Sequence, residues 1–206
     1  SFLQHRVGDA HAQLLMFGIA PELWVESQPE ARVRSANEPL RVLTLGNDRH
    51  RDWPTLAAAF AGDADVEVFV ASGTYPDDLL ASNIQRARCN LREVRARYAW
   101  ADVVVVPLVA NLHASGLTVL LEAVAAGKPV VVSDVGGLSH YLPGEAVTYV
   151  QAGQAQALSL ATKAVGRDTA EATKRVALAR RLFDERALHT PGYAARHVRL
   201  TEQLLA

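Results

Sequence analysis

The chain has 206 residues, of which half are hydrophobic, and 21 Lys and Arg against 22 Asp and Glu give it a formal net charge of -1. This length and composition suit one large domain or two small ones with a true core, and they exclude global disorder. The balanced charge argues against a dedicated nucleic-acid binder, and no apolar run reaches the roughly 18 residues that a membrane span needs. The single cysteine, Cys89, can form no internal disulfide, which suits a reducing cytosol.

The first 39 residues differ from the remainder of the chain. A helix is predicted over residues 5–17, and the Gly- and Pro-containing segment 18–21 ends it. A short strand is predicted over residues 23–25, and the polar residues 28–39 indicate a linker. We therefore divide the chain into an interdomain-type helix and linker over 1–39 and a Rossmann-like domain with C-terminal helices over 40–206.

From residue 40 onward, short β-rich runs alternate with helical patterns. The run of four valines in 102–107 predicts a strand buried on both faces, as in a parallel sheet covered by helices. The predicted strands are 41–45, 66–70, 83–88, 102–107, 129–133 and 146–150. The predicted helices are 53–61, 77–81, 91–100, 117–126, 154–165, 169–184 and 191–205. This pattern predicts an α/β fold with a doubly wound, mainly parallel sheet and helices on both faces.

Ligands of such sheets bind at the carboxyl ends of the strands, and the segment after residue 107 has the residue types for this. Ser115 and Gly116 open a helix, where free N–H groups and the helix dipole favour a phosphate. Thr118 adds a hydroxyl one residue into that helix. Glu122 follows one turn later among apolar residues, and its carboxylate can accept two hydrogen bonds from a ribose diol.

The run Leu120–Leu138, LEAVAAGKPVVVSDVGGL after its first leucine, resembles the donor-nucleotide half of retaining GT-B glycosyltransferases. This large group is related to glycogen and sucrose synthases, and the chain is most similar to its family 4-like members, the glycosyl transferases group 1. The resemblance implies that Glu122 binds the nucleotide ribose. It implies that the phosphates lie against Ser115, Gly116, Leu117 and Thr118.

Two further segments extend the resemblance over nearly the whole chain. Leu43–Phe60 matches the first strand, phosphate loop and helix of the family, and Ala12–Val25 is similar to the segment that joins its two domains. The family neutralises the donor diphosphate with an Arg and a Lys after the glycine of this loop. The corresponding loop residues here are Gly46, Asn47, Arg49 and Arg51. The resemblance does not decide which arginine contacts the phosphates.

The chain departs from the family in two ways. The family often carries a second glutamate eight residues before the ribose one, and that position is Ala114 here. The adjacent His113 is a candidate polar substitute, and we take His113 and Arg51 as the candidate catalytic residues. GT-B enzymes also need two Rossmann-like domains, and only the second is recognised here. Together with a start at Ser1, this predicts a separated C-terminal domain.

Simpler interpretations stay open for each candidate. Glu122 can be a solvent-facing helix residue, although its apolar neighbours leave little room for a polar face. His113 can be an ordinary loop histidine, and Arg49 and Arg51 can be solvated charges. The histidines show no metal-ligand spacing, so no metal site is predicted.

The resemblance implies a glycosyltransferase donor domain that binds a nucleotide-diphosphate sugar as substrate, requires no cofactor and is inactive without an N-terminal acceptor domain. Its partners would be that donor and an acceptor glycan, lipid or small molecule, and no nucleic acid. It would be cytoplasmic, or membrane-peripheral in the full-length protein. Self-association is expected through an interdomain face that includes Leu200, Leu204 and Leu205. The alternative is a non-catalytic nucleotide-binding or protein-interaction module of the same fold.

Overall fold

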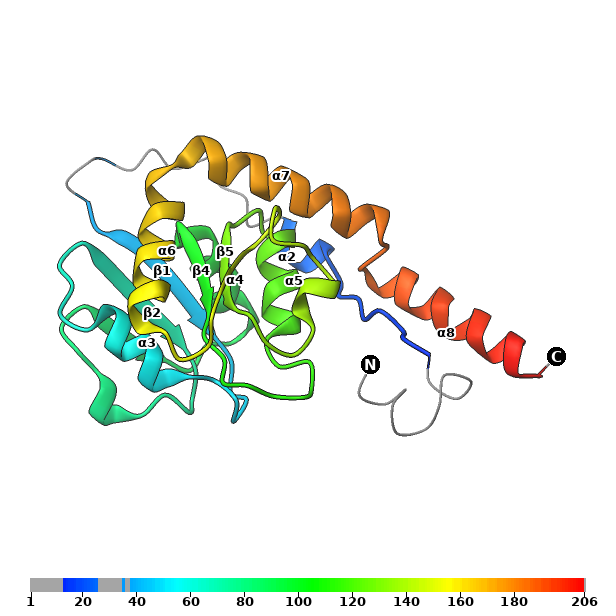
Figure 1. Cartoon of the computed structure of the whole chain (residues 1–206), viewed down its shortest axis with the longest axis horizontal. Coiled ribbons are helices and arrows are strands. Elements are labelled where there is room, and N and C mark those ends of the chain that lie inside the picture. The colour runs from blue at the N-terminus through cyan, green and yellow to red at the C-terminus, as the bar shows by residue number, and fades with distance from the viewer. Residues whose placement is uncertain (1–12, 26–34, 36–37, 206) are drawn as a thin grey trace.

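The computed structural model describes residues 13–25, 35 and 38–205, and within them it shows a six-stranded sheet with helices on both faces (Figure 1). The strand order is β3-β2-β1-β4-β5-β6, and every neighbouring pair is parallel. The strands are β1 Leu40–Leu45, β2 Val66–Ala71, β3 Ile84–Ala87, β4 Val103–Val106, β5 Val130–Ser133 and β6 Thr148–Val150. The predicted doubly wound α/β fold is confirmed.

Two helical layers enclose this sheet, because alternate strand residues enter separate hydrophobic clusters. One cluster unites strand residues such as Val42 and Val105 with α3 and α6, and the other unites residues such as Leu43 and Val104 with α4, α5 and α7. The helices are α2 Glu22–Val25, α3 Trp53–Phe60, α4 Leu91–Trp100, α5 Leu117–Ala125, α6 Ala155–Arg167, α7 Thr169–Glu185 and α8 Thr190–Leu205. Short 3-10 turns cover Asp77–Leu79, where a helix over 77–81 was expected, and Leu138–His140.

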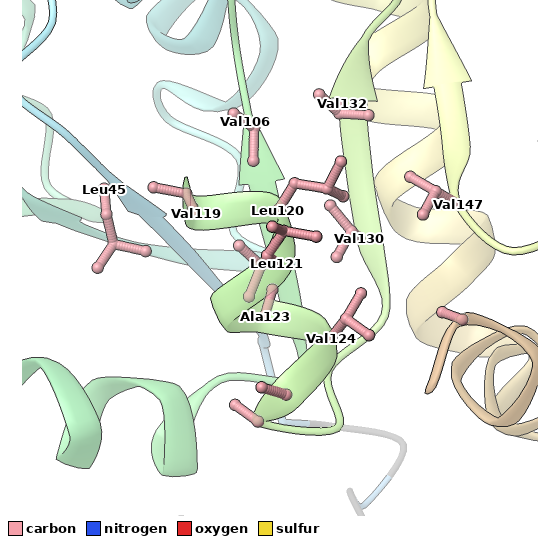
Figure 2. Close-up of a cluster of buried hydrophobic side chains, with 14 of the residues drawn as sticks. Leu45, Val106, Val119, Leu120, Leu121, Ala123, Val124, Val130, Val132 and Val147 are labelled. Atoms are coloured by element: carbon pink, nitrogen blue, oxygen red, sulfur yellow. The ribbon is translucent and has the colours of Figure 1, made fainter. Parts of the chain in front are cut away.

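The central packing contact fixes helix α5 against β4 and β5 (Figure 2). All four valines of β4 are fully buried, as the sequence predicts for a strand covered on both faces. From α5, Leu120 and Val124 point toward Val130 and Val132 of β5. Gly127 has a φ of +68° just beyond the helix, as expected for the residue that follows a helix end. This packing holds the first turn of α5 close to the carboxyl end of β4.

The N-terminal segment corrects two of the sequence predictions. Residues 22–25 form the short helix α2, and not a strand over 23–25, because Pro21 begins a single turn that buries Trp24. The Trp24 ring packs edge-on against Tyr98 of α4, with 5.3 Å between the ring centroids. Residues 13–17 have no regular secondary structure, so the end of the predicted helix 5–17 is wrong. Its first eight residues, and most of the linker 28–39, lie outside the described residues.

The two C-terminal helices differ in how they meet the domain. Helix α7 buries Ala179 and Phe183 against the α5 side, whereas α8 has no buried residue and extends away from the body of the domain (Figure 1). The large apolar residues that α8 exposes are Val198, Leu204 and Leu205. Among the described helices, none combines the length and apolar character that crossing a membrane requires.

Candidate nucleotide-binding site

The strand order reverses between β1 and β4, and the two loops that follow these strands lie together at that edge. Two backbone hydrogen bonds join them, from Asp52 N to Pro107 O and from Val109 N to His50 O, each 3.0 Å. The Asp52 side chain also accepts from Thr55 N, and this N-cap starts helix α3 as the sequence predicts. The loops that contain the predicted site residues are therefore fixed relative to each other.

Arg51 is the arginine that this arrangement turns inward. Its backbone pairs with Leu108 in an isolated antiparallel bridge, and the residue is only 8% exposed. Burial lowers the pKa of the guanidinium, and the negative charges of Asp48 and Glu122 oppose that shift. Two guanidinium nitrogens, Nε and Nη1, are buried and have no hydrogen-bond partner among the described residues. A buried cation with unpaired donors is costly, so these nitrogens indicate a place for an anionic ligand.

Two glycines leave the space that the Arg51 guanidinium occupies. Gly46 has a φ of +127° and Gly116 a φ of +80°, conformations that other residues rarely adopt. A Cβ at Gly46 would overlap the guanidinium, and one at Gly116 would lie 3.2 Å from Nη1 and 2.8 Å from Val106 Cγ1. Both glycines therefore serve close packing around Arg51.

Gly116 is also the N-cap of α5, where it offers no side chain to the first N–H groups of the helix. The adjacent Ser115 Oγ is buried and, within the described part of the chain, has no hydrogen-bond partner. Thr118 is exposed on the first turn, and Leu117 is buried in the core. The helix terminus thus presents N–H groups and a hydroxyl near the same loop as Arg51, which favours an anion.

Glu122 lies one turn further along α5 and does not face solvent freely. Its Oε2 accepts a 3.0 Å hydrogen bond from the hydroxyl of Tyr98, which is fully buried. Burial raises the pKa of Glu122 to about 7, although this hydrogen bond and the charge of Arg51 act to lower it. A carboxyl group that changes charge near neutral pH, beside a buried arginine, is typical of a functional site.

The structure separates the remaining predicted residues into different roles. Arg49 is exposed, so the buried arginine of the loop is Arg51. Asn47 Oδ1 accepts from Gly73 N at 2.7 Å and from Ser72 Oγ at 3.2 Å, which ties the loop after β1 to the loop after β2. His113 is exposed and contacts His50 across the two joined loops.

The comparison with known families decides what kind of domain this is. A family model described as Glycosyl transferases group 1 matches residues 28–168. The chain belongs to this glycosyl transferase family. No curated protein matches the chain. The matched residues include β1, the Arg51 loop, α5 and Glu122, so the family covers the whole candidate site.

Several solved glycosyltransferase structures contain a domain with the same fold as this chain. Sucrose-phosphate synthase from Thermosynechococcus elongatus has 23% identity and a TM-score of 0.79, over 99% of this chain and 56% of that one. A glycosyltransferase from Rickettsia africae has 13% identity and a TM-score of 0.79, over 98% and 59%. HepE from Anabaena, in complex with UDP and glucose, has 15% identity and a TM-score of 0.70, over 92% and 55%. The chain has the fold of the C-terminal domain of a GT-B glycosyltransferase, and it spans just over half the length of these proteins.

Three polar residues near the site were not predicted as site residues from the sequence. Tyr98 was assigned only as an apolar position of helix 91–100, and its bond to Glu122 depends on how α4 and α5 pack. Asp48 and His50 lie in the recognised phosphate loop, but their contact with His113 spans two loops 63 residues apart. The available signal was their shared position after β1 and β4, because adjacent parallel strands end at one edge.

Proposed function

We propose that this domain binds the nucleotide-diphosphate sugar donor of a glycosyltransferase. The observation that carries the proposal is the buried Arg51, whose Nε and Nη1 have no partner among the described residues. It lies against Gly116, at the uncapped N-terminus of α5. A diphosphate would supply the missing acceptors for the guanidinium and for the helix N–H groups.

Glu122 is proposed to bind the ribose of the same ligand. It lies on the helix that begins at Gly116, close enough to Arg51 for their charges to interact. Its carboxylate would accept hydrogen bonds from the two ribose hydroxyls, while Tyr98 holds the other side of the group. HepE, one of the structural relatives, has been solved with UDP and glucose and with UDP-glucose, which agrees with a ligand of this class.

The chemistry proposed for the site is mostly electrostatic. As an acceptor hydroxyl attacks the anomeric carbon, the bond to the diphosphate breaks and negative charge grows on the leaving oxygens. Arg51 and the α5 N-terminus would stabilise that charge, a preorganised effect that serves the transition state directly. His113 would contact the sugar where the family glutamate is replaced by Ala114.

We further propose that the acceptor binds to another domain, so that this domain alone binds donor and transfers no sugar. The absence of a carboxylate at Ala114 leaves one alternative, a nucleotide-binding module without transferase activity. An assay of hexosyl transfer by a protein that contains this domain together with an acceptor domain distinguishes a transferase from a nucleotide-binding module without activity. Robust transfer by the 206-residue chain by itself would contradict the need for a second domain.

Calorimetric titration with UDP, GDP and ADP tests the binding proposal. One of these should bind with one site per chain, and Glu122→Ala should weaken that binding. Glu202→Ala is the matched control, because Glu202 is exposed on the distant helix α8. Binding of no nucleotide by the well-folded chain, or equal binding by Glu122→Ala, would contradict the proposal.

The exposed apolar residues of α8 suggest a second property. Leu204 and Leu205 are 75% and 83% exposed, and nothing in the described domain covers them. We propose that α8 mediates self-association of the isolated chain, since exposed apolar clusters of this kind tend to be covered in solution. Sedimentation of the wild type against Leu204→Ser, Leu205→Ser tests this, and a monomer at high wild-type concentration would contradict it.

A further inference from the structure

The loops beside Arg51 bring together three side chains outside the proposed diphosphate and ribose contacts: Asp48, His50 and His113. Asp48 Oδ1 lies 3.0 Å from His50 Nδ1, and His50 Nδ1 lies 2.5 Å from His113 Nε2. Asp48 Oδ2 is 3.8 Å from His113 Nε2. Each of these three residues offers one possible metal-ligand atom, and these atoms all lie within 4.8 Å of one another. Among the described residues, no other three His, Cys, Asp or Glu side chains come together in this way.

We propose that Asp48, His50 and His113 bind a divalent transition-metal ion of the zinc type. Ligand atoms of a tetrahedral zinc ion lie about 3.3 Å apart, given bond lengths near 2.1 Å. The observed separations, which involve either oxygen of Asp48, run from 2.5 to 3.8 Å and so span that value. Two imidazoles and one carboxylate suit zinc, cobalt or nickel better than magnesium or calcium, which prefer oxygen ligands.

The contact between the two imidazole nitrogens supports this assignment. His50 Nδ1 faces both a carboxylate oxygen and His113 Nε2, so at most one of the two ring nitrogens can carry a proton in the space between them. Two ring nitrogens and a carboxylate oxygen, all possible metal ligands, thus face one common space. A cation between the three groups accepts a lone pair from each of them and neutralises the carboxylate.

The scaffold holds the proposed ligands in place and leaves them reachable. The His50 carbonyl accepts from Val109 N, and the Asn111 side chain accepts from His113 N at 3.2 Å, so both histidines are fixed through their backbones. The side chains of Asp48, His50 and His113 are 31%, 18% and 49% exposed, which provides an entry path. Three protein ligands leave a fourth position open, as in zinc sites that bind a water or a substrate.

This inference departs from the sequence expectation that no metal site exists. That expectation rested on spacing along the chain, whereas the ligands come from loops after β1 and β4 that meet only in the fold. The ligand set contains no nucleotide atom, so metal binding can be measured without donor, although His113 is shared with the proposed sugar contact.

The test uses the metal alone. The chain, free of affinity tags, is titrated with Zn²⁺ by calorimetry and with Co²⁺ by visible absorption, without nucleotide. We expect one saturable site per chain and the intense Co²⁺ bands of a tetrahedral centre. His113→Ala should weaken binding by at least about 10-fold, the lower end of the effect of losing even an outer partner of a metal ligand.

Two further variants complete the design. Asp48→Asn should weaken binding in the same way, and His197→Ala, at an exposed histidine of α8, should bind as the wild type does. Circular dichroism checks that each variant folds, which we expect because His113 is an exposed loop residue. No saturable binding, or binding that is the same in His113→Ala, would overturn the proposal.

Discussion

The Tyr98 hydroxyl donates a 3.0 Å hydrogen bond to Glu122 Oε2, which links helix α4 to the candidate ribose ligand on α5. Tyr98 is fully buried, and its ring packs edge-on against Trp24. The hydroxyl therefore cannot turn to water, and it constrains one oxygen of the carboxyl group. Because it donates to the carboxylate, it also acts to lower the pKa of Glu122, against the larger effect of burial.

The first prediction is that donor binding tightens as pH rises through about 7, where Glu122 loses its proton. The ionised carboxylate accepts hydrogen bonds from the ribose hydroxyls more strongly than the neutral carboxyl group does. UDP-glucose is the probe of choice, because its diphosphate is esterified at both ends and does not titrate near neutral pH. Calorimetry from pH 5.5 to 8.5 measures the profile. A flat profile in Glu122→Gln is the control, and a flat profile in the wild type would contradict the prediction.

The second prediction concerns Tyr98→Phe, which removes the hydroxyl and keeps the ring. Loss of the hydrogen bond should raise the pKa of Glu122 above about 7, because one of the interactions that favour the carboxylate is gone. UDP-glucose binding at pH 7 should weaken several-fold and largely recover at pH 8.5. A purely structural role would instead weaken binding equally at both pH values, so the two profiles separate positioning from packing.

The third prediction concerns stability, and its sign follows from protonation. Between pH 4.5 and about 7, the folded state holds a proton on Glu122 that the unfolded chain has lost. The contribution of Glu122 to the unfolding free energy is therefore favourable at low pH and is lost as pH rises through about 7. Glu122→Gln cannot ionise, so at pH 8 it should exceed the wild type by up to about 3 kcal/mol. Near pH 4.5 the two should be similar.

Urea unfolding at a series of pH values measures this difference. Glu202→Gln, at an exposed site, should leave the curve unchanged. A Glu122→Gln variant less stable than the wild type at pH 8 would show that the carboxylate is favourably paired in the absence of ligand.

The fold was predictable because the hydrophobic patterns of its main strands and helices agree with the tertiary contacts that these elements make. The four valines of β4 and the apolar stripe of α5 each permit one placement, inside a sheet covered by helices. The short segment around Trp24 was not predictable in this way. Three apolar residues fit a strand or a helix equally well, and the core contact with Tyr98 decides between them.

The site was predictable as a set of residue types, but its geometry was not. Gly116 caps the helix on which Glu122 lies, less than two turns further along, so their relation follows from the sequence. The choice between Arg49 and Arg51 does not, because the backbone bridge from Arg51 to Leu108 turns one side chain inward, and that bridge joins loops far apart in the chain. The contact between His50 and His113 was not predictable for the same reason, because it also joins two loops far apart in the chain.

The last prediction uses the two arginines of this loop as a matched pair. Arg51→Met removes a buried cation with two unpaired nitrogens and fills the space with a flexible apolar chain of similar length. At pH 5.5, where Glu122 is mostly protonated, the unfolding free energy should equal or exceed that of the wild type, since no hydrogen bond of Nε or Nη1 is lost. UDP affinity should fall about 10- to 100-fold, the range for lost charge-assisted hydrogen bonds.

Arg49→Met is the control, because it removes an equal charge from an exposed position of the same loop. It should change UDP affinity by less than about 3-fold, which is the screened effect of a surface charge. Calorimetry and urea unfolding of both variants give the answer. If Arg51→Met lost stability and kept affinity, Arg51 would be a structural residue, and the diphosphate would have to bind elsewhere. Stability retained with affinity lost would mean that the fold tolerates this unpaired cation for the sake of its ligand.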